Sequence, residues 1–128
     1  MTNFILDSYA WIEYLLATEK SAKIQKIFDE KENRVFTHIL SLAEISSRLK
    51  RGGGEDPQIL GRIGSISRLV TIDQMRSIQA GLLHSEMRKK IKDFGLVDAF
   101  ILLAARDLNA KILTGDPHFK NMKEVIMI

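Results

Sequence analysis

Phe4-Ile5-Leu6-Asp7-Ser8 is the stretch that decides the fold of this chain. Three apolar residues lead directly to an acid, and apolar residues with helical spacing follow from Tyr9 onward. An apolar run that ends at an acid and continues as a helix is typical of a buried parallel strand followed by a βα turn. Ligands of open α/β sheets bind beyond the carboxyl ends of such strands, so Asp7 is a candidate site residue. Asp is also a preferred helix N-cap, and capping is the alternative interpretation of Asp7 taken alone.

The composition is that of an ordinary globular domain. The 128 residues are 45% hydrophobic and 27% charged, which predicts one domain over residues 1–128. Cys is absent, which excludes disulfides and thiolate metal sites. No apolar run approaches the ~20 residues of a membrane span, and the first residues do not resemble a secretory signal. We therefore expect a cytoplasmic protein without a membrane partner, and the net charge of +3 mildly favours polyanionic partners.

Strand patterns alternate with helix patterns along the rest of the chain. Strands are predicted at 4–6, 34–37, 68–72, 111–114 and 125–127, and helices at 9–17, 21–30, from about 40 to 50, 58–67, 73–92 and 96–106. A glycine-rich loop, Arg51–Pro57, separates two of the helices, and Gly81 is a possible break in the helix at 73–92. This alternation predicts an α/β domain with a parallel sheet and right-handed crossovers.

Four acids lie in or beside apolar sequence, namely Asp7, Glu44, Asp98 and Asp116. An acid near a core must be paired, protonated or bound to a cation, and these apolar runs contain no Lys or Arg partner. Each acid follows a strand or begins a helix at the carboxyl edge of the predicted sheet, so a central first strand would bring all four together. Carboxylate oxygens suit hard divalent ions, which makes these acids candidate ligands of Mg²⁺ or Mn²⁺. Asp73 also follows a strand, but on an outer strand it would serve as an N-cap.

Four segments in this order resemble the PIN-domain ribonucleases, and most closely their VapC-type toxin branch. They are Ile5-Leu6-Asp7-Ser8, Leu42-Ala43-Glu44-Ile45, the stretch from Leu96-Val97-Asp98 to Ala104, and Leu113-Thr114-Gly115-Asp116-Pro117-His118-Phe119. The resemblance implies a three-layer α/β/α sandwich with a parallel sheet of about five strands in the order 3-2-1-4-5. It also implies Mg²⁺ or Mn²⁺ held by the four acids, with Ser8 and Thr114 as supporting residues.

The activity implied by the resemblance is metal-dependent endonucleolytic cleavage of single-stranded RNA, by the toxin of a toxin–antitoxin pair. A small antitoxin protein is then an expected partner. One departure concerns Pro117-His118, where the family often has another acid soon after the residue that matches Asp116. This departure reduces the possible metal ligands without removing the four acids.

Two other functions remain open from the sequence. A non-catalytic PIN-like module would bind RNA or a protein without cleavage, and a phosphoacceptor receiver-like domain would also gather acids on a parallel sheet. The receiver-like interpretation expects paired acids after the first strand and a late Lys, whereas Ser8 follows Asp7 here.

A homodimer is also expected. The apolar residues of Trp11–Leu16 and Ile24–Phe28 exceed what one sheet layer should cover. The alternative is that both stretches belong to the core of the domain. The basic segment Arg88-Lys89-Lys90 could follow RNA phosphates or form a solvated helix face.

Overall fold

The computed structural model describes residues 1–54 and 57–128, and its centre is an all-parallel sheet in the order β3-β2-β1-β4-β5. The strands are β1 (Asn3–Leu6), β2 (Arg34–His38), β3 (Arg68–Val70), β4 (Ala110–Thr114) and β5 (Val125–Met127). The helices are α1 (Ser8–Leu15), α2 (Ser21–Asp29), α3 (Ile39–Arg51), α4 (Pro57–Ile66), α5 (Gln74–Lys90) and α6 (Leu96–Leu108), with a short 3-10 helix η1 (Pro117–Phe119). The strand order 3-2-1-4-5 is thereby confirmed.

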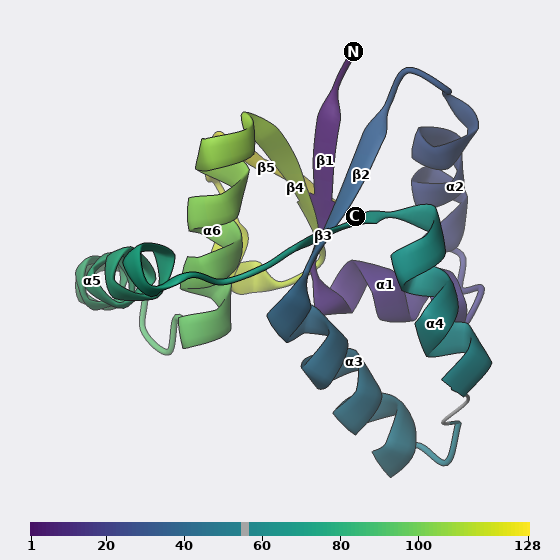
Figure 1. The fold of residues 1–128 in the computed structure, drawn as a ribbon, viewed down its shortest axis with the longest axis horizontal. Coiled ribbons are helices and arrows are strands. Elements are labelled where there is room, and N and C mark those ends of the chain that lie inside the picture. The colour runs from purple at the N-terminus through teal and green to yellow at the C-terminus, as the bar shows by residue number, and fades with distance from the viewer. Residues whose placement is uncertain (55–56) are drawn as a thin grey trace.

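Helices cover both faces of the sheet, with α5 and α6 on one side and α1 to α4 on the other (Figure 1). Alternate residues of the central strand β1 pack into the cores on the two opposite faces of the sheet. Leu6 belongs to the core beneath α1, α2 and α3, whereas Ile5 packs in the core beneath α6, and both are fully buried. Burial on both faces explains why β1 has no polar residue between Phe4 and Leu6. The predicted three-layer α/β/α sandwich is confirmed.

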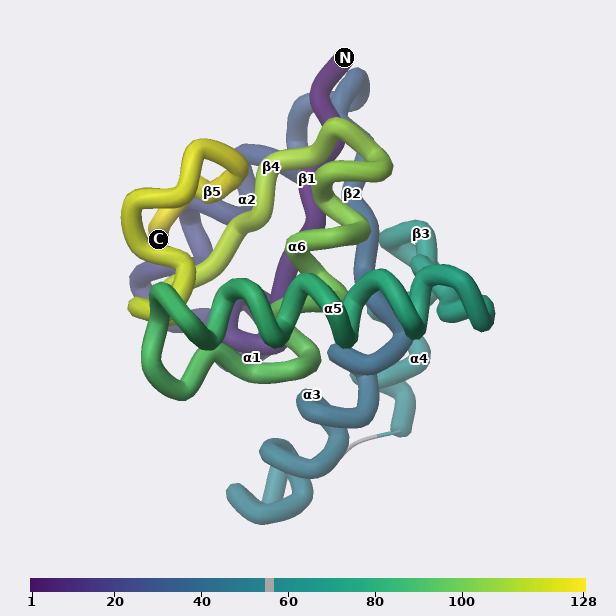
Figure 2. The backbone as a smooth tube through the Cα atoms, turned by 90° about the vertical axis from the view of Figure 1, so that its left-hand side faces the viewer, coloured from purple at the N-terminus to yellow at the C-terminus, as the bar shows by residue number. Residues whose placement is uncertain are grey.

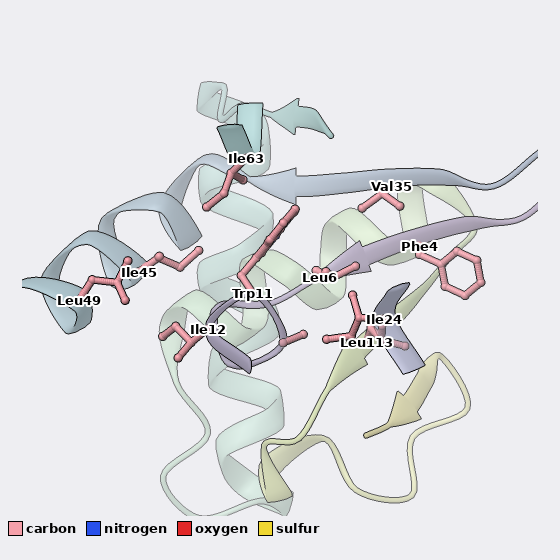
Figure 3. Packing of buried hydrophobic residues seen from close by; sticks show 11 residues of the cluster. Phe4, Leu6, Trp11, Ile12, Ile24, Val35, Ile45, Leu49, Ile63 and Leu113 are labelled. Atoms are coloured by element: carbon pink, nitrogen blue, oxygen red, sulfur yellow. The ribbon is translucent and has the colours of Figure 1, made fainter. Parts of the chain in front are cut away.

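The aromatic residues of α1 belong to the core. Trp11 is fully buried, and its indole Nε1 donates a 3.0 Å hydrogen bond to Thr37 Oγ1 of β2. Figure 3 shows Trp11 extending from α1 toward β2, and Ile45 and Ile63 belong to the same core cluster. Ile24 of α2 is also fully buried. The core alternative therefore holds for Trp11 and Ile24, because α1 and α2 pack against each other and the sheet, whereas Leu16 is 61% exposed.

Helix α5 runs across the outside of α6 without a break (Figure 2). The predicted break at Gly81 is wrong, since residues 74–90 form one helix. Arg76 near its start forms a 2.7 Å ion pair with Asp107 at the far end of α6, and His84 Nε2 lies 2.9 Å from the carbonyl oxygen of Phe94, just before α6 begins. The residues between β3 and α5 thus carry the chain to the far end of α6, so that α5 can return antiparallel to it.

Most predicted boundaries hold within two residues. The strand at 68–72 ends earlier, at Val70, and α6 extends two residues further, to Leu108. In the glycine-rich segment Arg51–Pro57, Arg51 ends α3 and Pro57 begins α4, whereas residues 55–56 lie outside the described part of the chain. Among the described residues, no helix has the length and apolar character needed to cross a membrane.

Candidate functional site

The four acids singled out from the sequence lie at one edge of the sheet. Asp7 follows β1, Asp116 follows β4, and Glu44 and Asp98 belong to the first half of α3 and the first turn of α6. Figure 1 shows that α1, α3 and α6 all begin around the carboxyl ends of the central strands. Register explains the convergence, because Leu6 pairs with Leu113 of β4 and with Thr37 of β2, so the three central strands end at about the same level.

Asp7 is a buried carboxylate with a hydrogen bond to each oxygen. Its Oδ1 accepts a 2.9 Å hydrogen bond from the Ala10 backbone N–H, which makes Asp7 the N-cap of α1. Its Oδ2 accepts a hydrogen bond from the hydroxyl of Thr114, a residue that is also fully buried. The capping interpretation and the site interpretation of Asp7 are therefore compatible, since the two oxygens face different partners.

Burial raises the pKa of Asp7 to about 7, and the negative charges of Asp116 and Asp98 add to that rise. The hydrogen bonds from Thr114 and Ala10 act in the opposite direction but do not compensate for the lost water. A carboxyl group with this pKa is half protonated near neutral pH unless a cation takes the place of the proton.

Asp98 and Asp116 are also held by local backbone contacts. Asp98 Oδ2 accepts a 3.0 Å hydrogen bond from the N–H of Gly95 at the start of α6. Asp116 Oδ1 accepts a 2.9 Å hydrogen bond from the His118 N–H, and the Asp116 N–H donates to Thr114 Oγ1 at 2.9 Å. Thr114 therefore connects Asp7 to the backbone of Asp116.

Burial also raises the pKa of Asp98, to about 6, and the charges of Asp116 and Glu44 raise it further. The pKa of Glu44 is raised by burial and by Asp116, while a hydrogen bond with Ser8 lowers it. These mutual effects connect all four acids electrostatically. Thr114 and Ser8, which were expected to support the acids, contact Asp7 and Glu44 respectively.

The aromatic ring of Tyr9 packs against the turn between β4 and η1. A side chain at Gly115 would overlap the ring of Tyr9. The hydroxyl of that ring accepts a 2.7 Å hydrogen bond from Lys20 Nζ. Gly115 therefore lets Tyr9 pack directly on the backbone that carries Thr114 and Asp116.

His118 is the residue beside the acids whose position the sequence did not indicate. Its Nδ1 lies 3.2 Å from Asp116 Oδ1 and 3.8 Å from Asp98 Oδ2. Donor atoms of Asp98, Asp116 and His118 all lie within 4.8 Å of one another, which suits a shared metal ion. The signals in the sequence were the two-residue spacing from Asp116, which η1 converts into proximity, and the resemblance to a family that often has an acid near this position.

The donor chemistry fits a divalent cation. Two carboxylates and an imidazole can converge on one ion. The pKa values of Asp7 and Asp98 are raised mainly by burial and further by the neighbouring acids, and a bound cation would favour the ionised form of both groups. Asp7 and Glu44 fall outside this closest group, so their role as ligands, direct or through water, stays a prediction.

Asp73 behaves as predicted for an N-cap. Its Oδ1 accepts a 2.7 Å hydrogen bond from the Arg76 N–H at the exposed start of α5. Asp73 follows β3, the edge strand beyond β2, whereas Asp7 follows the central strand.

Comparison with known proteins agrees with this fold. Residues 4–125 match the family model described as PIN domain. No curated protein matched the chain. Similar solved structures include a chain of VapBC2 from Rickettsia felis bound to a promoter DNA fragment, with 18% identity, a TM-score of 0.74, and coverage of 99% of this chain and 98% of that one.

Two further structures are similar to the same extent. A chain of DNA-bound VapBC from Salmonella typhimurium is 19% identical with a TM-score of 0.70, covering 100% of this chain and 98% of that one. VapC20 from Mycobacterium tuberculosis, described as a sarcin-ricin loop cleaving toxin, is 17% identical with a TM-score of 0.69, and the match covers 91% of this chain and 92% of that one. At these identities the likeness establishes the shared fold.

Proposed function

Since the chain belongs to the PIN domain family, we propose that residues 1–128 form one metal-dependent endoribonuclease domain of the VapC toxin type that cleaves single-stranded RNA. The observation that carries this proposal is the convergence of Asp7, Asp98 and Asp116 at the switch between β1 and β4, where burial raises the pKa of Asp7 and of Asp98. The fold likeness to a toxin described as cleaving the sarcin-ricin loop supports the proposed nuclease activity.

The proposed cofactor is Mg²⁺ or Mn²⁺, with Asp7, Glu44, Asp98 and Asp116 as the ligand set, directly or through water. A divalent ion bound there would supply Lewis-acid activation of the phosphodiester and of the attacking water. The contribution of the chain itself is to orient the carboxylates by hydrogen bonds. Thr114 and the Ala10 N–H orient Asp7, the Gly95 N–H orients Asp98, and Ser8 contacts Glu44.

A labelled single-stranded RNA incubated with purified protein and Mn²⁺ tests this function. Internal cleavage that stops in excess EDTA is the expected result, whereas cleavage that continues unchanged would contradict the metal mechanism. Binding of RNA without any cleavage would favour the alternative, a non-catalytic PIN-like module. The receiver-like interpretation is excluded by the strand order, since flavodoxin-like receivers have the order 2-1-3-4-5.

The proposed partners besides RNA are a small antitoxin and a second copy of the chain, acting in the cytoplasm. Similar folds occur in structures of toxin–antitoxin complexes, which supports the antitoxin. For the homodimer, a group of exposed apolar residues lies on α5, where Met75, Ile78 and Leu82 are each more than half exposed. Light scattering at tens of micromolar tests the dimer, and a monomer mass would contradict it.

A further inference from the structure

His118 occupies a fixed position beside the proposed metal site. Phe119, the next residue, is fully buried and packs edge-on against Phe94. The His118 N–H is held by Asp116 Oδ1, and Pro117 restricts the backbone before it. The backbone of His118 is thus anchored on both sides, while its side chain is 37% exposed.

The distances around His118 are those of donors that share an ion. Two donors each roughly 2.1 Å from one cation lie roughly 3 Å apart at a right angle and roughly 4 Å apart when opposite. His118 Nδ1 lies 3.2 Å from Asp116 Oδ1 and 3.8 Å from Asp98 Oδ2, which is within that range. The three groups can therefore bind one ion with little movement.

On the basis of the proposed function, we infer that His118 is a nitrogen ligand of the catalytic cation, and that it makes the site prefer Mn²⁺ and other first-row transition ions over Mg²⁺. Imidazole nitrogen suits transition ions, whereas Mg²⁺ takes oxygen ligands and retains its waters. His118 thus supplies a softer donor where the resemblance to the family led us to expect an acid.

The competing role for His118 is a cationic partner of the two acids. A protonated imidazole at these distances would form an ion pair with Asp116 and Asp98. The two roles predict opposite effects of removing His118 on metal affinity. Removal of a ligand weakens transition-metal binding, whereas removal of a competing positive charge strengthens the binding of every cation.

Metal affinities of wild type, His118→Ala and His118→Asp measured by calorimetry separate these roles, with Mn²⁺, Co²⁺ and Mg²⁺ as the probes. We expect His118→Ala to lower Mn²⁺ and Co²⁺ affinity by at least about tenfold and to change Mg²⁺ affinity by less than about threefold. His118→Asp should restore Mn²⁺ binding and shift the preference toward Mg²⁺. The exposed neighbour Lys120 provides the matched control, because Lys120→Gln removes a charge and no proposed ligand.

Pulsed electron paramagnetic resonance of the Mn²⁺-loaded protein gives a second readout that is independent of activity. A coupling to a directly bound ¹⁴N nucleus is expected in wild type and in Lys120→Gln, and its loss is expected in His118→Ala. If the wild-type protein binds Mn²⁺ and cleaves RNA but shows no such coupling, the inference about His118 is overturned and the proposed function stands. A higher affinity of His118→Ala for all three ions also overturns it. A wild type that neither binds Mn²⁺ nor cleaves RNA overturns the proposed function together with this inference.

Discussion

The hydroxyl of Thr114 donates a hydrogen bond to Asp7 Oδ2, and the two residues are separated by 107 positions in the sequence. This bond joins the ends of the neighbouring parallel strands β1 and β4 at the place where the acids meet. The same hydroxyl oxygen accepts from the Asp116 N–H, so one buried side chain positions two of the acids.

Thr114→Val removes this hydroxyl while keeping the shape of the side chain. The change leaves a buried carboxylate oxygen and the Asp116 N–H without their partner, so we expect a loss of ~1–3 kcal/mol in the free energy of unfolding. Urea denaturation of the metal-free protein measures it. Thr114→Ser retains the hydroxyl and is the control, and equal stability losses in Val and Ser variants would contradict this role.

Asp7→Asn tests the site through metal-linked stability. Asn caps a helix about as well as Asp, so the metal-free variant should be at least as stable as wild type. Wild type should gain ~2.7 kcal/mol when Mn²⁺ is a hundredfold above its dissociation constant, whereas the variant should gain far less and lose nearly all cleavage.

The matched control for that variant is Asp73→Asn, which changes an N-cap of the same kind outside the site. Thermal melts with and without Mn²⁺ should show full metal stabilisation in the control. If Asp7→Asn also retains the full Mn²⁺ stabilisation, Asp7 is not a ligand and the proposed site must be abandoned.

The raised pKa of Asp7 predicts how metal-free stability depends on pH. Between its ordinary pKa of 3.8 and its folded value of about 7, the folded protein binds more protons than the unfolded chain. The free energy of unfolding therefore falls as pH rises through this window. Relative to Asp7→Asn, wild type should lose ~2 kcal/mol between pH ~5.5 and ~8, because a unit of pKa is worth ~1.4 kcal/mol.

The difference in stability between wild type and Asp7→Asn in EDTA cancels the contributions of the other titrating groups to the pH dependence. These include the buried His38, whose pKa is lowered by burial. Mn²⁺ should reverse the trend, since metal binding needs the ionised carboxylate, so that metal stabilisation grows with pH. Parallel curves for the two metal-free proteins would show that Asp7 keeps an ordinary pKa.

Gly81→Ala should stabilise the protein. Gly81 lies exposed inside the unbroken helix α5, and an added Cβ would meet no atom within 4 Å. We expect a gain of ~0.5–1 kcal/mol, because Ala restricts the unfolded chain and favours the helix. Urea denaturation checks this, and no gain would indicate that α5 is frayed or bent at residue 81.

The central part of the fold could be predicted because its determinants are local. Phe4–Leu6 is apolar on both faces, and strand ends followed by helices place Asp7 and Asp116 at one edge. The path of α5 could not be predicted, since it depends on tertiary packing along α6, where Arg76 also pairs with Asp107. The choice between core and dimer contact for Trp11 stayed open for a similar reason, because helical spacing does not tell a core face from a partner face.

The candidate site could be predicted as far as its acids and the hydroxyls beside them. Acids in apolar sequence stand out, and Ser8 and Thr114 adjoin them in the chain or in the motif that carries the resemblance. His118 could not be placed, because a histidine two residues after an acid usually carries no special meaning. Only the short helix η1 turns its ring toward Asp98.

The contact between Tyr9 and Gly115 also limits how this chain can evolve. A larger residue at 115 would overlap the ring of Tyr9, so either the ring or the turn that carries Thr114 and Asp116 would have to move. If Tyr9 is first replaced by a small residue, the same change at 115 finds space. The residues at positions 9 and 115 are therefore coupled, because a side chain at 115 needs the space that the ring of Tyr9 occupies.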